Sequence, residues 1–182
     1  MYANLRCCTA VISRFWAASR ATSAIEFALL APLFLGTLIA IFETAIFLFA
    51  QQTLQTAAAD AGRLIMTGQV QNAGMTQAQY ANAICPMIQP LFNCSNLMVD
   101  VANYSSFIGA NTAEPTLTYN AQGQVNNTWS YAPGTPGQVM VVRLIYQWPV
   151  VSGLLGFALA NLQNGYAEMM GVSAFRVEPY SG

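Results

Sequence analysis

The feature that most constrains this chain of 182 residues is an apolar run from Ala24 to Ala50 that carries two carboxylates, Glu26 and Glu43. About 20 apolar residues cross a bilayer as a helix, so the run is long enough to span a membrane and exceeds the apolar core of an ordinary secretory signal. Pro32 lies inside it and predicts a local bend. A charge at the centre of a spanning helix costs about 2.5–3.5 kcal/mol, and we therefore expect both carboxylates to have partners.

The basic residues predict which way this helix crosses. Three of the six, Arg6, Arg14 and Arg20, precede the apolar run, and the chain contains neither Lys nor His. By the positive-inside rule we expect a cytoplasmic N-terminus and export of everything after Ala50. A hydrophobic content of 55% with only 7% charged residues is typical of a membrane-attached protein. No basic cluster follows the run, so nucleic-acid binding is not supported.

The four cysteines divide between the two sides of this topology. Cys7 and Cys8 fall on the reducing, cytoplasmic side, whereas Cys85 and Cys94 fall on the exported side and are close enough in sequence to close a small loop. We interpret the second pair as a disulfide, with two buried free thiols as the alternative. A metal site is a poorer interpretation, because two cysteines without histidine supply too few ligands. No motif for a cofactor is present.

The helical pattern continues beyond the membrane run. Small and apolar residues recur at three- and four-residue spacing, which predicts one helix as far as about Thr67, with Gly68 as its stop. On this pattern Gln51, Gln55 and Asp60 are expected to face away from the packed side.

A short second helix is predicted after this stop. Thr76 followed by Gln79 three residues later forms a capping-box pattern, which marks a helix N-terminus. Pro86 is expected to end the helix, because proline lacks the backbone N–H that a helix interior requires.

The remaining chain has the pattern of strands. Alternating or β-branched residues predict three of them, at 97–102, 139–146 and 172–177. The polar stretch 111–138 is expected to form a loop or an irregular hairpin. Residues 148–160 are apolar but short for a second span, so they form either a packed loop and helix or an exposed apolar surface. The expected fold is α+β: a long N-terminal transmembrane helix extending into the periplasm, then a small head with a short helix and a mainly antiparallel β-sheet.

Three stretches of the long helix, taken together, resemble a known family. ATSAIEFALLAP, the glutamate in IFETAIF, and QTAAADAGRLIMTG are similar to TadE-like proteins, the minor pseudopilins of the tight-adherence (Tad, or Flp) pilus system. The downstream stretch VVRLIYQWPVVSGLLG and the ending SAFRVEPY are similar to the exported part of that family. The most specific part is the pair Glu26 and Phe27 at the head of the apolar run. A structural role in a type IV-like pilus for surface adhesion and biofilm formation is what this resemblance implies.

The resemblance also implies a processing event. A prepilin peptidase of the bacterial inner membrane would cut between Ala21 and Thr22, so that Glu26 becomes the fifth residue of the mature chain. The family pattern usually has Gly before the cut, and Ala21 departs from it, which leaves Ser19 to Ser23 as the window. The expected domains are a basic cytoplasmic leader at 1–21, a transmembrane and extended pilin-like helix at 22–67, and a periplasmic α+β head at 68–182.

A cut after Ala21 would give Glu26 a physical role. The new ammonium on Thr22 would lie at the same depth as Glu26, and two opposite charges about 4 Å apart gain about 4 kcal/mol at an effective dielectric constant of 20. Pairing with the amine of a neighbouring subunit would set the axial register of packed helices. Glu43 lies about 25 Å further along the helix. It either reaches the periplasmic interface or contacts a polar partner in another pseudopilin.

Four kinds of partner follow from the resemblance, besides membrane lipid. They are the prepilin peptidase, other TadE-like and TadF-like pseudopilins, the major Flp pilin and the inner-membrane pilus platform. A competing function is a permanently anchored periplasmic binding module or a pilus-tip adhesin, which would keep its anchor uncut or show ligand binding by the head. The string TAAADA can also be interpreted as a leader-peptidase site that would release a soluble head. Enzyme activity is not expected, because no His and no phosphate or metal motif is present.

Overall fold

A computed structural model describes residues 19–89, 91–150, 159–162 and 165–179, and the chain divides into two compact units between Glu43 and Thr44. Each unit is described by itself. Cys7 and Cys8, most of the basic leader, and residues 151–158 of the apolar stretch after β2 lie outside the described residues.

The first unit is described from the start of the long helix. Helix α2 (Ser19–Met66) continues through Pro32 without a break. Most of its large hydrophobic side chains as far as Phe42 are exposed, and Leu38 is half-buried. Of the described residues, one helical stretch, Ser23–Met66, is long and apolar enough to cross a membrane. Side chains exposed in this way require lipid or another apolar partner, since an isolated helix cannot bury them.

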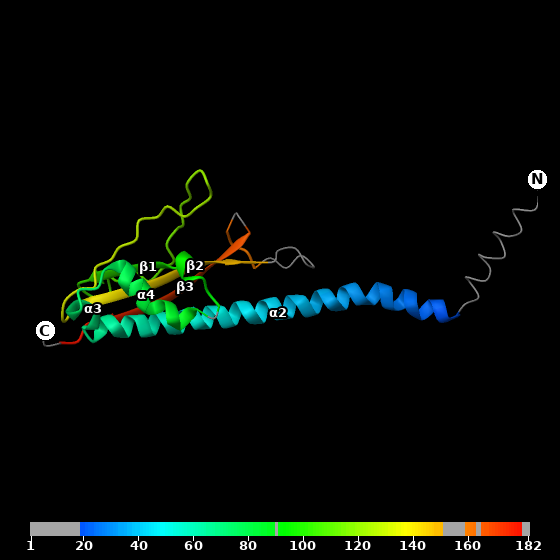
Figure 1. Ribbon diagram of the computed structural model, residues 1–182, viewed down its shortest axis with the longest axis horizontal. Helices are drawn as coiled ribbons and strands as arrows, with labels where there is room; N and C mark the ends of the chain where they lie inside the picture. The colour runs from blue at the N-terminus through cyan, green and yellow to red at the C-terminus, as the bar shows by residue number, and fades with distance from the viewer. Residues whose placement is uncertain (1–18, 90, 151–158, 163–164, 180–182) are drawn as a thin grey trace, which may run out of the picture. The chain divides into compact units, whose positions relative to one another are not determined.

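The second unit is built on a three-stranded antiparallel sheet of order β1-β2-β3. The strands are β1 (Met98–Tyr104), β2 (Val139–Pro149) and β3 (Tyr166–Arg176) (Figure 1). The α+β fold and the antiparallel sheet expected from the sequence are therefore confirmed. The third strand begins well before the expected residue 172, because β2 pairs with it from Pro149↔Tyr166 onward and this pairing outweighs the weak strand preference of its own first residues.

Three short helical segments lie between α2 and β1. They are α3 (Gln69–Asn72), α4 (Gln77–Ile88) and the 3-10 turn η1 (Cys94–Asn96). Gly68 has a φ of 76° at the end of α2, a conformation that glycine adopts without strain, so the predicted stop is confirmed.

The capping box that begins α4 is confirmed, but its predicted end is wrong. The Thr76 side chain accepts from the Gln79 backbone, and the Gln79 side chain accepts from the Thr76 backbone. The helix does not end at Pro86 and instead continues to Ile88. Only two helical residues follow the proline, so the missing N–H removes a single helical bond, while Ile88 is buried in the core.

The core lies between one face of the sheet and the helices of the second unit. On β2 this inner face carries alternate buried residues from Met140 to Tyr146, and α2 and α4 supply the opposing side chains. Residues of α2 at helical spacing are fully or almost fully buried, namely Ala50, Leu54, Ala57, Ala58, Ala61 and Ile65. The buried hydroxyl of Tyr80 in α4 donates to the Ala61 carbonyl at 2.7 Å and so ties α4 to α2.

Helix α2 covers the free edge of β3 with two glutamines that were expected to face away. Gln51 donates to the Met170 carbonyl at 2.9 Å, and Gln55 both donates to the Val172 carbonyl and accepts from its N–H. The expectation for Gln51 and Gln55 was wrong, because their amides satisfy edge groups that hydrophobic periodicity does not reveal. An edge covered in this way has fewer groups available for pairing with another strand. Asp60 is exposed, as expected.

Candidate functional site

The proposed processing bond lies near the start of the described part of α2. Ala21 and Thr22 both have helical backbone and are described here by their backbone only. Glu26 and Phe27 follow one turn later, both exposed, with Phe27 73% exposed. Thr22 and Glu26, four residues apart, lie on the same side of the helix.

Glu43 is placed differently from Glu26. It is half-buried, whereas Glu26 is exposed, and it is the last residue of the first unit. The structure thus places both carboxylates on α2 without bringing them together. Their contacts with other subunits, and the bend expected at Pro32, stay predictions.

The head contains a buried ion pair that the sequence did not predict. Asp100 of β1 and Arg143 of β2 are direct partners in the antiparallel register. The Nε and Nη2 atoms of Arg143 donate to Oδ2 of Asp100 at 2.8 and 2.6 Å. The side chain of Arg143 is only 12% exposed and that of Asp100 only 7%. Charge-assisted bonds of this kind, largely removed from solvent, are much stronger than an exposed ion pair.

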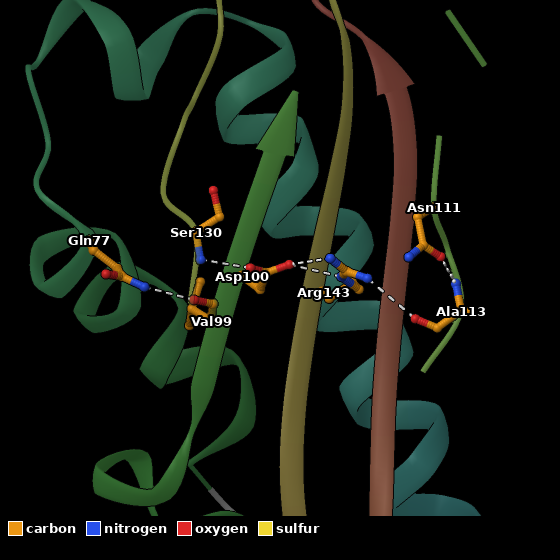
Figure 2. A network of polar contacts seen from close by, with 7 residues as sticks. All are labelled: Gln77, Val99, Asp100, Asn111, Ala113, Ser130 and Arg143. Atoms are coloured by element: carbon orange, nitrogen blue, oxygen red, sulfur yellow. Dashed lines mark hydrogen bonds and ion pairs between the residues drawn. The ribbon is translucent and has the colours of Figure 1, made fainter. Parts of the chain in front are cut away.

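This ion pair fastens the long β1–β2 connection to the sheet (Figure 2). The other oxygen of Asp100 accepts from the Ser130 backbone N–H at 2.8 Å, and Nη1 of Arg143 donates to the Ala113 carbonyl at 3.3 Å. Asn111 in turn accepts from the Ala113 N–H. Two segments of the connection that are far apart in sequence are therefore held by one pair of charges. We call Asp100, Arg143, Ser130 and Ala113 the latch.

The outer edge of β1 is covered by the same connection. The Val101 N–H donates to the Ser130 carbonyl, and the Val101 carbonyl accepts from the Ala132 N–H. Two residues earlier along this edge, Gln77 of α4 donates to the Val99 carbonyl at 2.8 Å (Figure 2). The connection itself forms an irregular hairpin, as expected, with Tyr119 opposite Val125.

The predicted disulfide joins the end of α4 to the turn before β1. Cys85 and Cys94 are bonded, with a Cα–Cα distance of 5.6 Å across nine positions of sequence. Cys94 is the first residue of η1, and the Asn93 side chain caps that turn by accepting from the Ser95 N–H. The bond therefore fixes the point at which the chain enters the sheet.

Burial shifts the pKa of several titratable groups in the head. Desolvation, with a smaller contribution from Tyr131, raises the pKa of Tyr80 far above its usual range. Burial also raises the pKa of Tyr131. The pKa of Glu168 is raised first by burial and then by the nearby Glu114 carboxylate, and its Oε1 is buried without a hydrogen-bond partner within the described part of the chain. Among the described residues, no cluster of three or more His, Cys, Asp or Glu side chains could hold a metal ion.

The chain has a long apolar helix followed by a small α+β head that contains a disulfide. This arrangement is compatible with single-pass membrane anchoring. Residues 21–63 match the family model described as TadE-like protein. Over the N-terminal helix, the match confirms the resemblance to TadE-like proteins of Tad pilus systems, a family with a structural role in the pilus. Comparison with curated proteins and with solved structures finds no match.

Proposed function

We propose that the chain is a minor pseudopilin of a Tad pilus, cut by a prepilin peptidase and involved in initiating or assembling the pilus. The observation that carries the proposal is the extent of the family match, which begins at Ala21, the residue before the proposed cut, and includes Glu26 and Phe27. On this account the leader is cytoplasmic, the apolar part of α2 lies in the bacterial inner membrane, and the head is periplasmic.

The position of the proposed cut suits a peptidase. A protease generally needs an extended substrate, and the bond between Ala21 and Thr22 lies before the apolar run that begins at Ala24, so a cut there leaves that run intact. A cut further along would require the interior of the apolar helix to open. Ala21 is small and so fits a pocket that normally takes Gly.

Cleavage changes the electrostatics at the head of the helix. It creates an ammonium on Thr22, four residues before the exposed Glu26 carboxylate. The amine of its own chain or that of a neighbouring subunit then neutralises Glu26. The attraction between the ammonium and the carboxylate, about 4 kcal/mol at an effective dielectric constant of 20, is of the same order as the cost of placing a charge in the membrane. Pairing between chains fixes the axial register of neighbouring helices.

The exposed apolar surface of α2 is what would bind other subunits after extraction from the bilayer. Most of its large hydrophobic side chains up to Phe42 are exposed. Partners on this account are other TadE-like and TadF-like pseudopilins, the major Flp pilin and the inner-membrane platform. Glu43 supplies a second polar contact further along the same helix.

A complementation experiment tests this function. Deleting the chain from its host should abolish or strongly reduce surface pili counted by electron microscopy, and the wild-type chain should restore them. Glu26→Gln should fail to restore them, although immunoblotting finds the protein in the membrane. Asp60→Asn, which removes an exposed carboxylate from the same helix beyond the apolar run, is the matched control and should restore pili. Normal piliation in the deletion strain would overturn the proposal.

A further inference from the structure

A cleft of about 520 Å³ opens on the head, at the end of the sheet where β1 begins. Its floor comes from all three strands. Met98 of β1, Gln147 of β2 and Tyr166 of β3 line it, and the register places them on the face of the sheet opposite the helices. The volume lies within the roughly 300–1,000 Å³ of small-molecule sites.

The wall of the cleft is the irregular hairpin of the β1–β2 connection, from which Gly123, Gln124 and Val125 line it. The hairpin closes through two backbone bonds, from Asn120 N–H to the Gln124 carbonyl and from Asn126 N–H to the Thr118 carbonyl. It is tied to the floor because Gln147 Nε2 donates to the Tyr119 hydroxyl at 2.9 Å.

Trp129 completes the lining, and the latch positions it. The next residue, Ser130, is held by its N–H bond to Asp100 and by its carbonyl bond to the Val101 N–H. A second wall is η1, where Ser95 and Asn96 line the cleft directly after Cys94 of the disulfide. Both walls are therefore fixed by strong or covalent contacts.

The chemistry of the lining is aromatic and amide-rich. Trp129 and Tyr166 offer apolar ring faces, and Tyr166 is 38% exposed. Asn96, Gln124 and Gln147 each carry both a donor and an acceptor. Among the described residues, Trp129 Nε1, Gln124 Nε2 and Gln147 Oε1 make no protein hydrogen bond, so these groups are available to a ligand. No charged residue is among the described residues that line the cleft.

We propose that this cleft binds an uncharged saccharide of one or two rings. A sugar ring presents polarised C–H groups on its face, which suit the negative face of an aromatic ring, and hydroxyls on its edge, which act as donor and acceptor at once. Side-chain amides match such hydroxyls because they too combine both functions. A charged ligand finds no counter-charge here, and a purely apolar one would leave the amides unsatisfied. The inference goes beyond pilus assembly and does not rest on it.

Saccharide titration of the full-length chain tests the proposal. The protein is held in a polyoxyethylene detergent, because maltoside or glucoside detergents would themselves present sugars. The probes are the methyl glycosides of glucose, galactose, mannose and N-acetylglucosamine, together with cellobiose and chitobiose. Binding is followed by saturation-transfer NMR of the sugar and by tryptophan fluorescence. We expect saturable binding of at least one probe.

Substitutions locate the binding. Trp129→Ala should weaken the affinity about tenfold and Gln124→Ala about fivefold. Trp129→Phe keeps a ring face, so the NMR signal should persist while the fluorescence response is lost. The matched controls are Phe107→Ala, an exposed aromatic residue outside the cleft, and Gln122→Ala, on the same hairpin. Both should leave the affinity unchanged.

Two results would overturn the proposal. One is the absence of saturable binding of every probe up to about 50 mM, about fiftyfold above a Kd of 1 mM. The other is binding that Trp129→Ala and Gln124→Ala leave as tight as in the wild type. Gln124→Ala keeps the test decisive if Trp129→Ala fails to fold, because Gln124 is exposed and its side chain makes only one long bond, accepting from Asn120 at 3.2 Å.

Discussion

Gly171 of β3 lies directly against the backbone carbonyl of Leu54 in α2, and a Cβ at position 171 would overlap that carbonyl. The contact sets how closely the helix approaches the sheet, because backbone cannot move aside as a side chain can. It also brings Gln51 and Gln55 within reach of the β3 edge.

We therefore predict that Gly171→Ala destabilises the head by about 1–3 kcal/mol through overpacking. Urea unfolding of the full chain in detergent, followed by tryptophan fluorescence, measures the change. Gly109→Ala is the control, since a Cβ there meets nothing closer than 3.9 Å, and its effect should stay within about 0.5 kcal/mol. Equal stability of the two variants would mean that α2 does not pack on β3 in this way.

The latch gives a second prediction. Arg143→Met leaves the Asp100 carboxylate buried without its counter-charge and should cost about 3–5 kcal/mol. The double variant Asp100→Leu with Arg143→Met should recover most of this loss, since neither charge is then left buried alone. A double-mutant cycle by urea unfolding measures both effects. If the single variant were as stable as the wild type, the pair would be exposed in solution.

Hydrogen exchange reports on the same latch at the backbone. In Arg143→Met the connection loses its bond at Ala113, and exchange near residues 111–119 should become faster. Arg63→Gln is the matched control, because Arg63 is exposed and makes no ion pair among the described residues. Its exchange pattern should equal that of the wild type.

Short sequence patterns predicted the secondary-structure elements of the head better than they predicted the contacts between distant residues. The capping box at Thr76 and the glycine stop at Gly68 depend on a few neighbouring residues, and both were predicted correctly. The pairing of Asp100 with Arg143 joins residues 43 positions apart, so it depends on strand register, which no pattern within either strand reveals.

The first half of β3 was missed for a related reason. Glu168, Met169 and Gly171 have little strand preference, and only their pairing with β2 makes them a strand. The cleft escaped sequence reasoning as well, since its lining comes from separate segments that only the fold brings together. In contrast, the residues of the proposed processing motif are contiguous, and the family match covers Ala21 to Phe27.

The disulfide between Cys85 and Cys94 leads to two predictions, one about the stability of the head and one about the number of free thiols. Breaking the bond by Cys85→Ser with Cys94→Ser should destabilise the head by about 2.5 kcal/mol, the loop-closure estimate for so short a loop. Alkylation under denaturing, non-reducing conditions should find no free thiol in a chain cut after Ala21, because Cys7 and Cys8 are then removed. Two reactive thiols would indicate either an uncut chain or a cut chain without the disulfide, which intact mass distinguishes, and four would indicate an uncut chain without the disulfide.

Glu168 should make stability depend on pH. Its pKa in the folded state is raised above the ordinary value of 4.5, so the folded state binds the proton more tightly than the unfolded state. The free energy of unfolding should therefore fall as the pH rises from 4.5 through the raised pKa, and then level off. Glu168→Gln should remove this component, and its stability relative to the wild type should increase with pH. A difference that is constant from pH 4 to pH 8 would contradict this.

The central claim is that the chain is a processed pilin-like subunit, and the N-terminus of the mature protein tests it most directly. Intact mass and N-terminal sequencing should be carried out on protein extracted from membranes of cells with and without the prepilin peptidase. The account predicts an N-terminus at Thr22 in the first case and at Met1 in the second. An N-terminus at Met1 in both would leave a permanent membrane anchor, and one near Asp60 would make the head a secreted protein; either result would contradict the account.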